Sequence, residues 1–407
     1  MPSDPPNYLR RRLLVLFLAL FILVVGIGVP VAVLGPVPGA RAAVDVTGAA
    51  HAATKRAELD FPAFGSSAVA LVGRNGLLGT AGSQAPKQMA SITKLVTALT
   101  VLDRHPLKGS AAGPTIRFTA ADEAILQDVL AHDGSWEAVQ AGWTLTERQT
   151  LQAMLIPSAN NYARSLANWA FGSEQQYLTA ARSYLAAHHL THTTVVSPDG
   201  LDPRNRSTPG DLIALGRLAL RSSVITSIVG KARVTEPHIG TIENTNALIG
   251  HSALNGIKTG TTDAGHANLL FSAPLTVHSQ RLQVIGVILD ANSHDQLDAA
   301  VGPLLTSVRA GLHTITLARQ HQVFAHYRTA WGGSAAAVAS KDVTRLVWSK
   351  QDVHGTAHLQ AISGGLQGDR VGTVSYTLDG RRVEVPLELD RSLLVAPVWW
   401  RLMHPLR

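Results

Sequence analysis

The 407-residue chain contains no cysteine. Disulfide bonds, thiol catalysis and cysteine-bound metals are therefore excluded, and the absence suits an extracytoplasmic protein because no thiol is exposed to stray oxidation. The 17 histidines show no H-E-x-x-H pattern or equivalent pairing with carboxylates, so we interpret them as surface residues and expect no metal site.

Charge is also scarce. Asp, Glu, Lys and Arg make up 15% of the residues, the net charge is +7, and no basic run is interleaved with aromatic residues. Nucleic acid is therefore not expected as a partner, whereas the anionic surface of a cell envelope suits a mildly basic protein. The apolar fraction of 46% can supply a full core, and the length allows two or three domains.

The N-terminal region carries one long apolar run. Three arginines at 10–12 precede an uncharged segment at 13–34, which is long enough to cross a bilayer as a helix. The positive end should stay inside, so residues 1–12 are predicted to be a cytoplasmic basic end and the remaining chain to be exported.

Two interpretations of the apolar run stay open. A retained transmembrane anchor fits its length, whereas the small-x-small site Ala40-Arg41-Ala42 fits a cleaved signal peptide. The following stretch 35–59 is rich in Ala, Gly and Pro with little periodicity, which predicts a linker.

The stretch 89–102, M-A-S-I-T-K-L-V-T-A-L-T-V-L, contains a candidate nucleophile and base. Ser91 and Lys94 are three residues apart, so a helix beginning at Ser91 puts both on one face. Apolar residues cover most of that helix and predict its burial, which lowers the pKa of a lysine and lets Lys94 accept the Ser91 proton. Taken alone, the pattern fits an ordinary helix N-cap better.

A second polar pair follows a predicted helix. Thr146 and Gln149 form a capping-box pattern, and Pro157 ends the helix that this pattern opens. Ser158 and Asn160 then lie on a tight turn from which their side chains can point into a cleft. The alternative is that Ser158 only caps the next helix.

A third pattern is G-I-K-T-G-T at residues 256–261. In a regular strand Lys258 and Thr259 point to opposite faces, and Gly260 allows a ligand backbone to approach closely. A cationic Lys258 would bind a carboxylate, although a lone K-T-G is equally typical of an exposed strand lysine.

Short β segments are predicted at both ends of the globular chain. An Asn75-Gly76 pair predicts a hairpin, and the segments are 67–72, 77–80, 267–273, 282–289, 335–348, 357–362, 373–378 and 383–387. Residues 312–392 contain no catalytic constellation and predict a second, mostly β domain, in which Pro386 indicates an edge strand.

The tail 393–407, with tryptophans beside arginine, fits an amphipathic membrane-interface segment or a packing segment equally well.

The three motifs together are far more specific than any one. With S-I-T-K at Ser91, S-A-N at Ser158 and K-T-G at Lys258, the chain resembles the penicillin-recognising serine transferases, and within them the D-alanyl-D-alanine carboxypeptidases of the low-molecular-weight penicillin-binding proteins. The resemblance runs from about residue 66 to 387 and includes L-I-P-S-A-N-N, S-P-D-G-L-D and N-G-I-K-T-G-T-T. It implies an α+β fold, with a transpeptidase-like catalytic domain at 60–311 whose antiparallel sheet is flanked by helices, followed by the small β domain.

The resemblance implies acyl transfer on peptidoglycan stem pentapeptides. Ser91 attacks the carbonyl of the penultimate D-alanine, Lys94 takes its proton, and N–H groups of Ser91 and Thr261 form the oxyanion hole. Ser158 relays a proton to the leaving D-alanine, and water then hydrolyses the acyl-enzyme. The implied substrate-binding residues are Asn160 for the peptide amide, Lys258 and Thr259 for the terminal carboxylate, and Gly260 and Thr261 beside them.

The family also implies partners and a location. β-Lactam antibiotics are expected as inhibitors, the membrane surface as a neighbour, and the extracytoplasmic face of the cell membrane as the location. No metal or organic cofactor is implied. The chain departs from common family patterns at S-P-D-G-L-D (197–202) and at Thr261, both of which border the substrate site.

Three other functions are weighed against this one. A class A β-lactamase needs a glutamate for deacylation, but Glu174, the first glutamate after the S-x-N motif, lacks the E-x-x-x-N pattern. A non-catalytic peptidoglycan-binding or regulatory protein would be expected to have lost Ser91 or Lys94. An endopeptidase acting on cross-links uses the same chemistry and stays an alternative.

Overall fold

The computed structural model describes residues 8–44, 57–251, 253–349, 353–378 and 380–404. They divide into two compact units. We call Ala57–Leu312 the helical unit, and Met1–Arg56 together with His313–Arg407 the β unit.

The helical unit is built on a five-stranded antiparallel sheet with the order β10-β11-β12-β2-β3. The predicted hairpin is confirmed, because β2 and β3 flank the Asn75-Gly76 turn and pair Val69 with Gly79. The strands are β2 (Ser66–Leu71), β3 (Gly79–Gly82), β10 (Gly256–Thr261), β11 (Ala267–Val277) and β12 (Gln280–Ala291).

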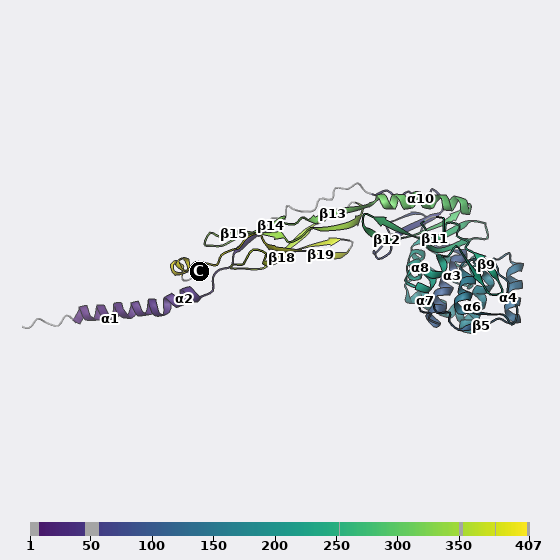
Figure 1. Ribbon diagram of the computed structural model, residues 1–407, viewed down its shortest axis with the longest axis horizontal. Helices are drawn as coiled ribbons and strands as arrows, with labels where there is room; N and C mark the ends of the chain where they lie inside the picture. The colour runs from purple at the N-terminus through teal and green to yellow at the C-terminus, as the bar shows by residue number, and fades with distance from the viewer. Residues whose placement is uncertain (1–7, 45–56, 252, 350–352, 379, 405–407) are drawn as a thin grey trace, which may run out of the picture. The chain divides into compact units, whose positions relative to one another are not determined.

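Helices cover both faces of this sheet, as Figure 1 shows for α10 above β11 and β12 and for α8 below them. On the lower side Gly216 of α8 (Pro209–Arg221) lets the helix approach closely, because a Cβ there would lie 2.5 Å from Ile285. The other helices are α3 (Thr93–Arg104), α4 (Ala120–Ala131), α5 (Glu147–Leu155), α6 (Asn160–Phe171), α7 (Glu174–Ala187), α9 (Ser223–Val229) and α10 (His294–Ala310).

Local signals set several helix starts. The predicted capping box of Thr146 and Gln149 opens α5, and Thr208 caps α8 with Pro209 in its first turn. Three short antiparallel pairs complete the unit: β4 (Lys87–Gln88) with β7 (Arg206–Ser207), β5 (Thr115–Arg117) with β6 (Thr144–Thr146), and β8 (Arg233–Glu236) with β9 (Gly240–Glu243).

The central helix begins later than predicted. Ser91 lies in a 3-10 turn, η3 (Ala90–Ile92), and α3 starts at Thr93. Ala90 has a left-handed φ of 48°, so the regular helix cannot extend back to it. The predicted burial is confirmed, because residues 93–101 of α3 are all buried against α5, α6, α7 and α8.

The β unit contains a six-stranded sheet with the order β1-β14-β15-β19-β18-β17 and a separate β13-β16 pair. Its apolar side chains form one core. The strands are β1 (Arg41–Val44), β13 (Leu312–Ala318), β14 (Val323–Arg328), β15 (Ser334–Ala339), β16 (Val343–Trp348), β17 (Gly355–Leu359), β18 (Arg370–Leu378) and β19 (Arg381–Leu389).

Two details of this unit differ from the sequence predictions. Strand β1 falls inside the predicted linker 35–59 and pairs with β14, because an edge strand is held by its neighbour and a short Ala-rich segment carries little strand signal of its own. Pro386 lies in β19, between β15 and β18, so its predicted edge position is wrong. The β15 ladder ends at Leu387, so the N–H that Pro386 lacks is not needed on that side.

The N-terminal helix is the only one among the described residues with the length and composition to cross a membrane. It comprises α1 (Tyr8–Leu23), the π-helical turn η1 (Val24–Gly28) and α2 (Val29–Leu34), and none of its residues is buried. Residues 1–7 of the predicted basic end, 45–56 of the linker and 405–407 of the tail lie outside the described residues.

The C-terminal tail folds back on this helix within the β unit. Helix α11 (Val398–Met403) packs against α2, and the Arg401 guanidinium donates to the carbonyl oxygens of Val33 at 2.8 Å and Gly35 at 3.3 Å. Trp400 is buried, whereas Trp399 is 64% exposed.

Candidate active site

Ser91 and Lys94 meet at the start of α3. The turn and the helix place the Lys94 Nζ 2.8 Å from the Ser91 Oγ, as the i, i+3 spacing predicted. Nζ also donates to the backbone oxygen of Asp199 at 2.8 Å and to the side-chain Oδ1 of Asn160. When Lys94 is neutral, its two N–H groups are bonded to the oxygens of Asp199 and Asn160. The lone pair of the amine then points toward the Ser91 hydroxyl.

Burial sets the protonation of Lys94. The side chain is fully buried, and desolvation lowers its pKa to about 7, while the charge of Asp199 raises it slightly. A substantial fraction of this lysine is therefore neutral near pH 7 and able to accept a proton. The predicted burial of Lys94 is confirmed, and its role as the base stays a prediction.

The loop 197–202 supports this pair from the other side. Asp199 is buried, and its carboxylate accepts hydrogen bonds from the Ser197 hydroxyl at 2.6 Å and the Leu201 N–H at 3.1 Å. Gly200 has a φ of 88°, and a Cβ there would lie 2.1 Å from the Ala90 oxygen. Only glycine therefore lets this loop approach the Ser91 turn.

Ser158 is held in a strained conformation. Its φ of 70° lies in the left-handed region, and its Oγ is buried without a hydrogen-bond partner while the residue lines the cleft. The alternative role as a helix cap is not observed, because Ala159 is the N-cap of α6 and no side chain caps it. A buried free hydroxyl in a cleft is available to a substrate.

Asn160 contacts the base directly. Its backbone N–H donates to the Ser135 oxygen at 2.7 Å, and its Oδ1 accepts from Lys94. The side chain therefore orients Lys94 as well as lining the cleft, a positioning contact that the motif alone did not predict.

Strand β10 brings the third motif to the same place. Lys258 is 2% exposed, and its Nζ lies 3.4 Å from the Thr259 Oγ1 and 3.5 Å from the Thr245 Oγ1. Burial and then the nearby charge of Lys94 hold the pKa of Lys258 well below its usual range. The Lys258 Nζ therefore lies near the Thr259 Oγ1, although the alternation of side chains along a regular strand predicts opposite faces for these two residues.

Gly260 makes a close approach, but to the nucleophile turn. A Cβ at Gly260 would lie 3.0 Å from the Met89 oxygen and 3.3 Å from the Ser91 nitrogen. The absence of a side chain therefore allows β10 to lie against the turn that carries Ser91. The next residue, Thr261, shares a 3.0 Å hydrogen bond between its Oγ1 and the His294 Nε2.

These residues surround one cleft of about 640 Å³. Six of the eight predicted site residues line it, and Lys94 and Lys258 lie buried directly behind its wall. Sequence analysis missed the other lining residues, of which the most relevant to chemistry are Thr245, His294, His132 and Asp263. The one sequence signal for the Asp199 carbonyl is the S-P-D-G-L-D motif at 197–202, to which the sequence analysis assigns no role.

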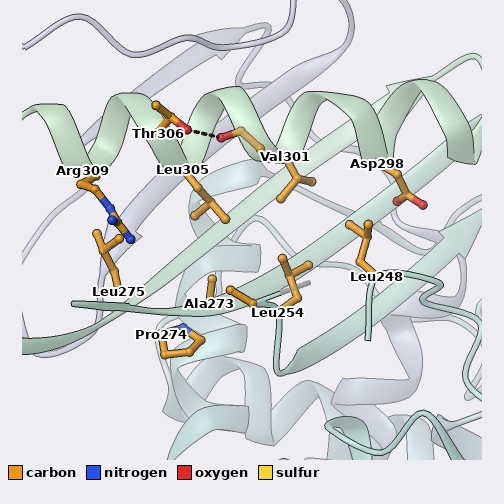
Figure 2. Close-up of a pocket in the computed structure, with 12 residues that line it drawn as sticks. Leu248, Leu254, Ala273, Pro274, Leu275, Asp298, Val301, Leu305, Thr306 and Arg309 are labelled. Carbon is orange, nitrogen blue, oxygen red and sulfur yellow. Dashed lines mark hydrogen bonds between the residues drawn. The ribbon is translucent and has the colours of Figure 1, made fainter. Parts of the chain in front are cut away.

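A second hollow, of about 480 Å³, lies beside α10 and is different in kind. Figure 2 shows leucine, alanine, valine and proline side chains along it, with Asp298 near one end and Arg309 near the other. Its Thr306 hydroxyl already donates to the Gly302 oxygen at 3.0 Å. None of the eight predicted site residues is among the described residues that line this second hollow.

Comparison with known proteins identifies the family of the chain. Residues 66–293 match the D-alanyl-D-alanine carboxypeptidase family. D-alanyl-D-alanine carboxypeptidase DacD of Escherichia coli is 24% identical over 329 residues, covering 78% of each chain. The D-alanyl-D-alanine endopeptidase of Pseudomonas aeruginosa is 31% identical over 191 residues, which is 44% of this chain and 57% of that one.

The fold is shared with penicillin-binding protein 6B of Escherichia coli. The TM-score is 0.59 at 20% identity, over 85% of this chain and 99% of that chain. The predicted α+β fold and the predicted family are confirmed. With the matched region spanning all three motifs, the chain belongs to the D-alanyl-D-alanine carboxypeptidase family of serine peptidases.

Proposed function

We propose that the protein removes the terminal D-alanine from peptidoglycan stem peptides through an acyl-enzyme on Ser91. The observation that carries this is the 2.8 Å contact between Ser91 Oγ and a buried Lys94 whose pKa is lowered to about 7. Lys94 takes the hydroxyl proton as Oγ bonds to the penultimate carbonyl carbon. The developing oxyanion is held by the Ser91 and Thr261 N–H groups.

The leaving group needs a proton as the peptide bond breaks. The free, buried Ser158 hydroxyl passes a proton from the two buried lysines, Lys94 and Lys258, to the D-alanine nitrogen. Water then attacks the ester carbon and gives a proton to Lys94. Lys94 returns a proton to the Ser91 Oγ as the ester bond breaks. Thr259 lines the cleft beside Lys258, and this arrangement supports its assignment to the terminal carboxylate.

A first experiment tests acylation. The full chain in detergent is mixed with excess benzylpenicillin and followed by intact mass, with Ser91→Ala as the matched control. One long-lived adduct that is absent from Ser91→Ala supports the proposal. An adduct that vanishes within seconds while penicillin is consumed favours a β-lactamase, and no adduct favours a non-catalytic wall-binding protein.

A second experiment separates two peptidase activities. The similarity to a D-alanyl-D-alanine endopeptidase keeps cleavage of cross-linked stems as a second candidate function. Free D-alanine released from a pentapeptide is compared with monomeric stem peptides released from a cross-linked dimer on the same enzyme. Faster release from the pentapeptide supports the carboxypeptidase, whereas preferential cleavage of the dimer overturns it.

We further propose that the N-terminal helix stays attached and holds the protein on the extracytoplasmic face of the membrane. The candidate signal cleavage site at 40–42 overlaps β1, where Ala42 pairs with Tyr327 of β14, so cleavage after Ala42 would cut a strand of the sheet. Arg401 also binds the carbonyls at the end of α2. Membrane fractions should contain the intact N-terminus, and a mature chain beginning near residue 43 would contradict the anchor.

A further inference from the structure

The β unit contains two arginines that lie directly opposite each other without a counter-ion. Arg41 of β1 pairs with Arg328 of β14, both are exposed, and no ion pair joins either one to an acidic residue in the part of the chain that the structure describes. Opposite residues of an antiparallel pair have Cβ atoms about 5 Å apart on one face, where like charges are destabilising. By contrast, Arg370 of β18 lies opposite Glu388 of β19. The first pair therefore lacks an anion that would neutralise it.

Arg328 also lines a hollow of about 580 Å³. Other polar groups along it are the His326 ring, the Ser334 hydroxyl and the Arg391 guanidinium. His326 and Arg328 alternate along β14 with the buried Tyr327, so the hollow lies on the face of the sheet that points away from the core. A guanidinium offers only donors, in a planar fork that matches the oxygens of a phosphate. The hollow is therefore suited to an anionic group.

Asp390 is the one acidic residue among the described residues that line this hollow, and its carboxylate is already engaged. Its Oδ1 accepts a hydrogen bond from the Ala336 N–H at 2.6 Å, and its Oδ2 lies 3.0 Å from the Nε and from the Nη2 of Arg391. Asp390 thus holds the end of β19 beside β15 and neutralises Arg391. The charges of Arg328 and of Arg41 opposite it stay available to a ligand.

A chain of contacts connects the hollow to the end of the N-terminal apolar helix. The turn between β14 and β15 supplies Gly332 to the lining, and Trp331 in the same turn lies against Trp400 of α11, with ring centroids 5.5 Å apart. Helix α11 packs in turn against α2, where Arg401 binds two backbone carbonyl oxygens at the helix end. The hollow is therefore held near the point at which the chain leaves the apolar helix.

We propose that Arg41 and Arg328, with the hollow beside them, bind the phosphate of an anionic phospholipid headgroup. The inference rests on the proposed membrane anchor, because the anchor brings this part of the β unit to the membrane surface. The phosphate oxygens accept hydrogen bonds from both guanidinium groups, and the negative charge removes the repulsion between them. A bound headgroup then holds the β unit at the membrane through a contact that is separate from the apolar helix.

The test uses the full chain in phosphatidylcholine vesicles that contain a small share of photoreactive phosphatidylglycerol. Mass spectrometry measures cross-linking on the turn 329–333, so lipid bound at the arginines of the N-terminal end does not contribute. Arg328→Gln and Arg41→Gln should each lower this cross-linking by about fivefold, and Arg328→Lys, which keeps the charge, should recover part of the loss. Arg345→Gln on β16 makes the same change of net charge at an exposed position and should have no effect.

Thermal stability separates a binding role from a structural one. In neutral detergent without anionic lipid, Arg328→Gln should leave the unfolding temperature of the full chain unchanged or raise it, because the substitution removes a like-charge pair. Added phosphatidylglycerol should raise the unfolding temperature of the unmodified protein more than that of Arg328→Gln. A lower unfolding temperature of Arg328→Gln without lipid would assign a structural role to this arginine and overturn the proposal.

Three results of the cross-linking experiment would also overturn the proposal. Equal labelling by phosphatidylglycerol and phosphatidylcholine probes would show that the headgroup charge is not recognised, and an equal loss in Arg345→Gln would show an effect of net charge alone. Displacement of the lipid probe by inorganic phosphate, but not by an equal concentration of chloride, would assign the hollow to a soluble anion.

Failure of the membrane anchor gives a different result. If the mature chain begins near residue 43, Arg41 is lost while Arg328 and the hollow remain. Sedimentation of that mature chain with phosphatidylglycerol vesicles then replaces the reconstituted protein. Weaker sedimentation of Arg328→Gln supports the headgroup site without the anchor, and equal sedimentation of the two proteins contradicts the site.

Discussion

The helical unit and the β unit bury different kinds of side chain. The described part of the helical unit buries five charged residues, namely Lys94, Lys258, Asp199, Glu236 and Glu147, and the Glu147 carboxylate oxygens have no hydrogen-bond partner. In the described part of the β unit the large buried polar groups are tyrosines, and Tyr327 donates its hydroxyl to the Gln360 oxygen at 2.8 Å.

The difference separates groups whose charged form is disfavoured by burial from groups whose polar atom is satisfied by a hydrogen bond. A buried lysine without a carboxylate partner costs folding free energy, because water no longer solvates its charge. A buried tyrosine bonded to a carbonyl loses little, because its polar atom is satisfied. The buried lysines near Ser91 therefore lower the stability of the helical unit. The described core of the β unit contains no buried lysine that would lower its stability in the same way.

The strongest way to break this comparison is to remove the buried base. Lys94→Met should lower the rate of benzylpenicillin acylation by about a thousandfold, because the proton acceptor is lost. It should also raise the thermal stability at pH 7. Calorimetry and intact mass measure the two effects, and Lys341→Met, at an exposed position of the β unit, is the control that should leave both unchanged.

The sign of that stability gain follows from the pKa values. Lys94 has a pKa of about 7 when folded and 10.5 as an isolated group, so between these values the unfolded chain binds the extra proton and the lysine opposes folding. The gain from Lys94→Met should therefore be largest at pH 7 and below and should disappear as the pH approaches 10.5. A gain that grows with pH would contradict the assignment.

The protonation of Lys94 should also govern the reaction rate. Acylation should rise by about a hundredfold from pH 5 to pH 8, with a midpoint near pH 7, because only the neutral amine accepts the Ser91 proton. Stopped-flow acylation with benzylpenicillin measures the profile, and circular dichroism at each pH controls for unfolding. A flat profile would remove Lys94 from the role of base.

A smaller effect is expected from the contact between β10 and the nucleophile turn. Gly260→Ala should lower acylation by about tenfold, because its Cβ would meet the Met89 oxygen at 3.0 Å and displace Ser91 by a few tenths of an ångström. Gly302→Ala on α10 is the matched control, since a Cβ there meets nothing within 4 Å. Equal rates for the two variants would show that the close approach is unimportant.

The smallest effect on activity should come from the β unit. Tyr327→Phe should destabilise this unit by about 1–2 kcal/mol, because the Gln360 and Val371 carbonyls lose their donor. Acylation should stay within about twofold of the unmodified rate, since Tyr327 belongs to the β unit and every described cleft residue to the helical unit. Urea unfolding measures the loss of stability. A large loss of acylation would contradict the expectation that this substitution in the β unit leaves the reaction at Ser91 unchanged.

Much of the site was predictable because its spacing is local. The i, i+3 separation of Ser91 and Lys94 and the apolar residues around them already predict a buried pair, and the structure confirms the contact. The Asn75-Gly76 hairpin and the Thr146 capping box also depend on neighbouring residues alone. Family membership was predictable for the same reason, since three short motifs occur in the expected order.

The features that escaped prediction depend on partners distant in the chain. The Asp199 carbonyl reaches Lys94 across 105 residues, and His294 reaches Thr261 across 33. Strand β1 exists because β14 provides its hydrogen bonds, and Pro386 is tolerated inside the sheet because the β15 ladder stops beside it. No local pattern contains this information.

The sequence by itself determined which groups are available for the proposed chemistry, since a serine, a lysine and their motifs are chemical identities encoded at short spacing. Only the tertiary structure decided the state of those groups. Lys94 has a pKa of about 7 because distant helices exclude water from it, and Ser158 keeps a free hydroxyl because its backbone turn and its surroundings leave it no partner. Desolvation and hydrogen-bond satisfaction depend on everything that surrounds an atom, so they arise only when the whole unit has folded.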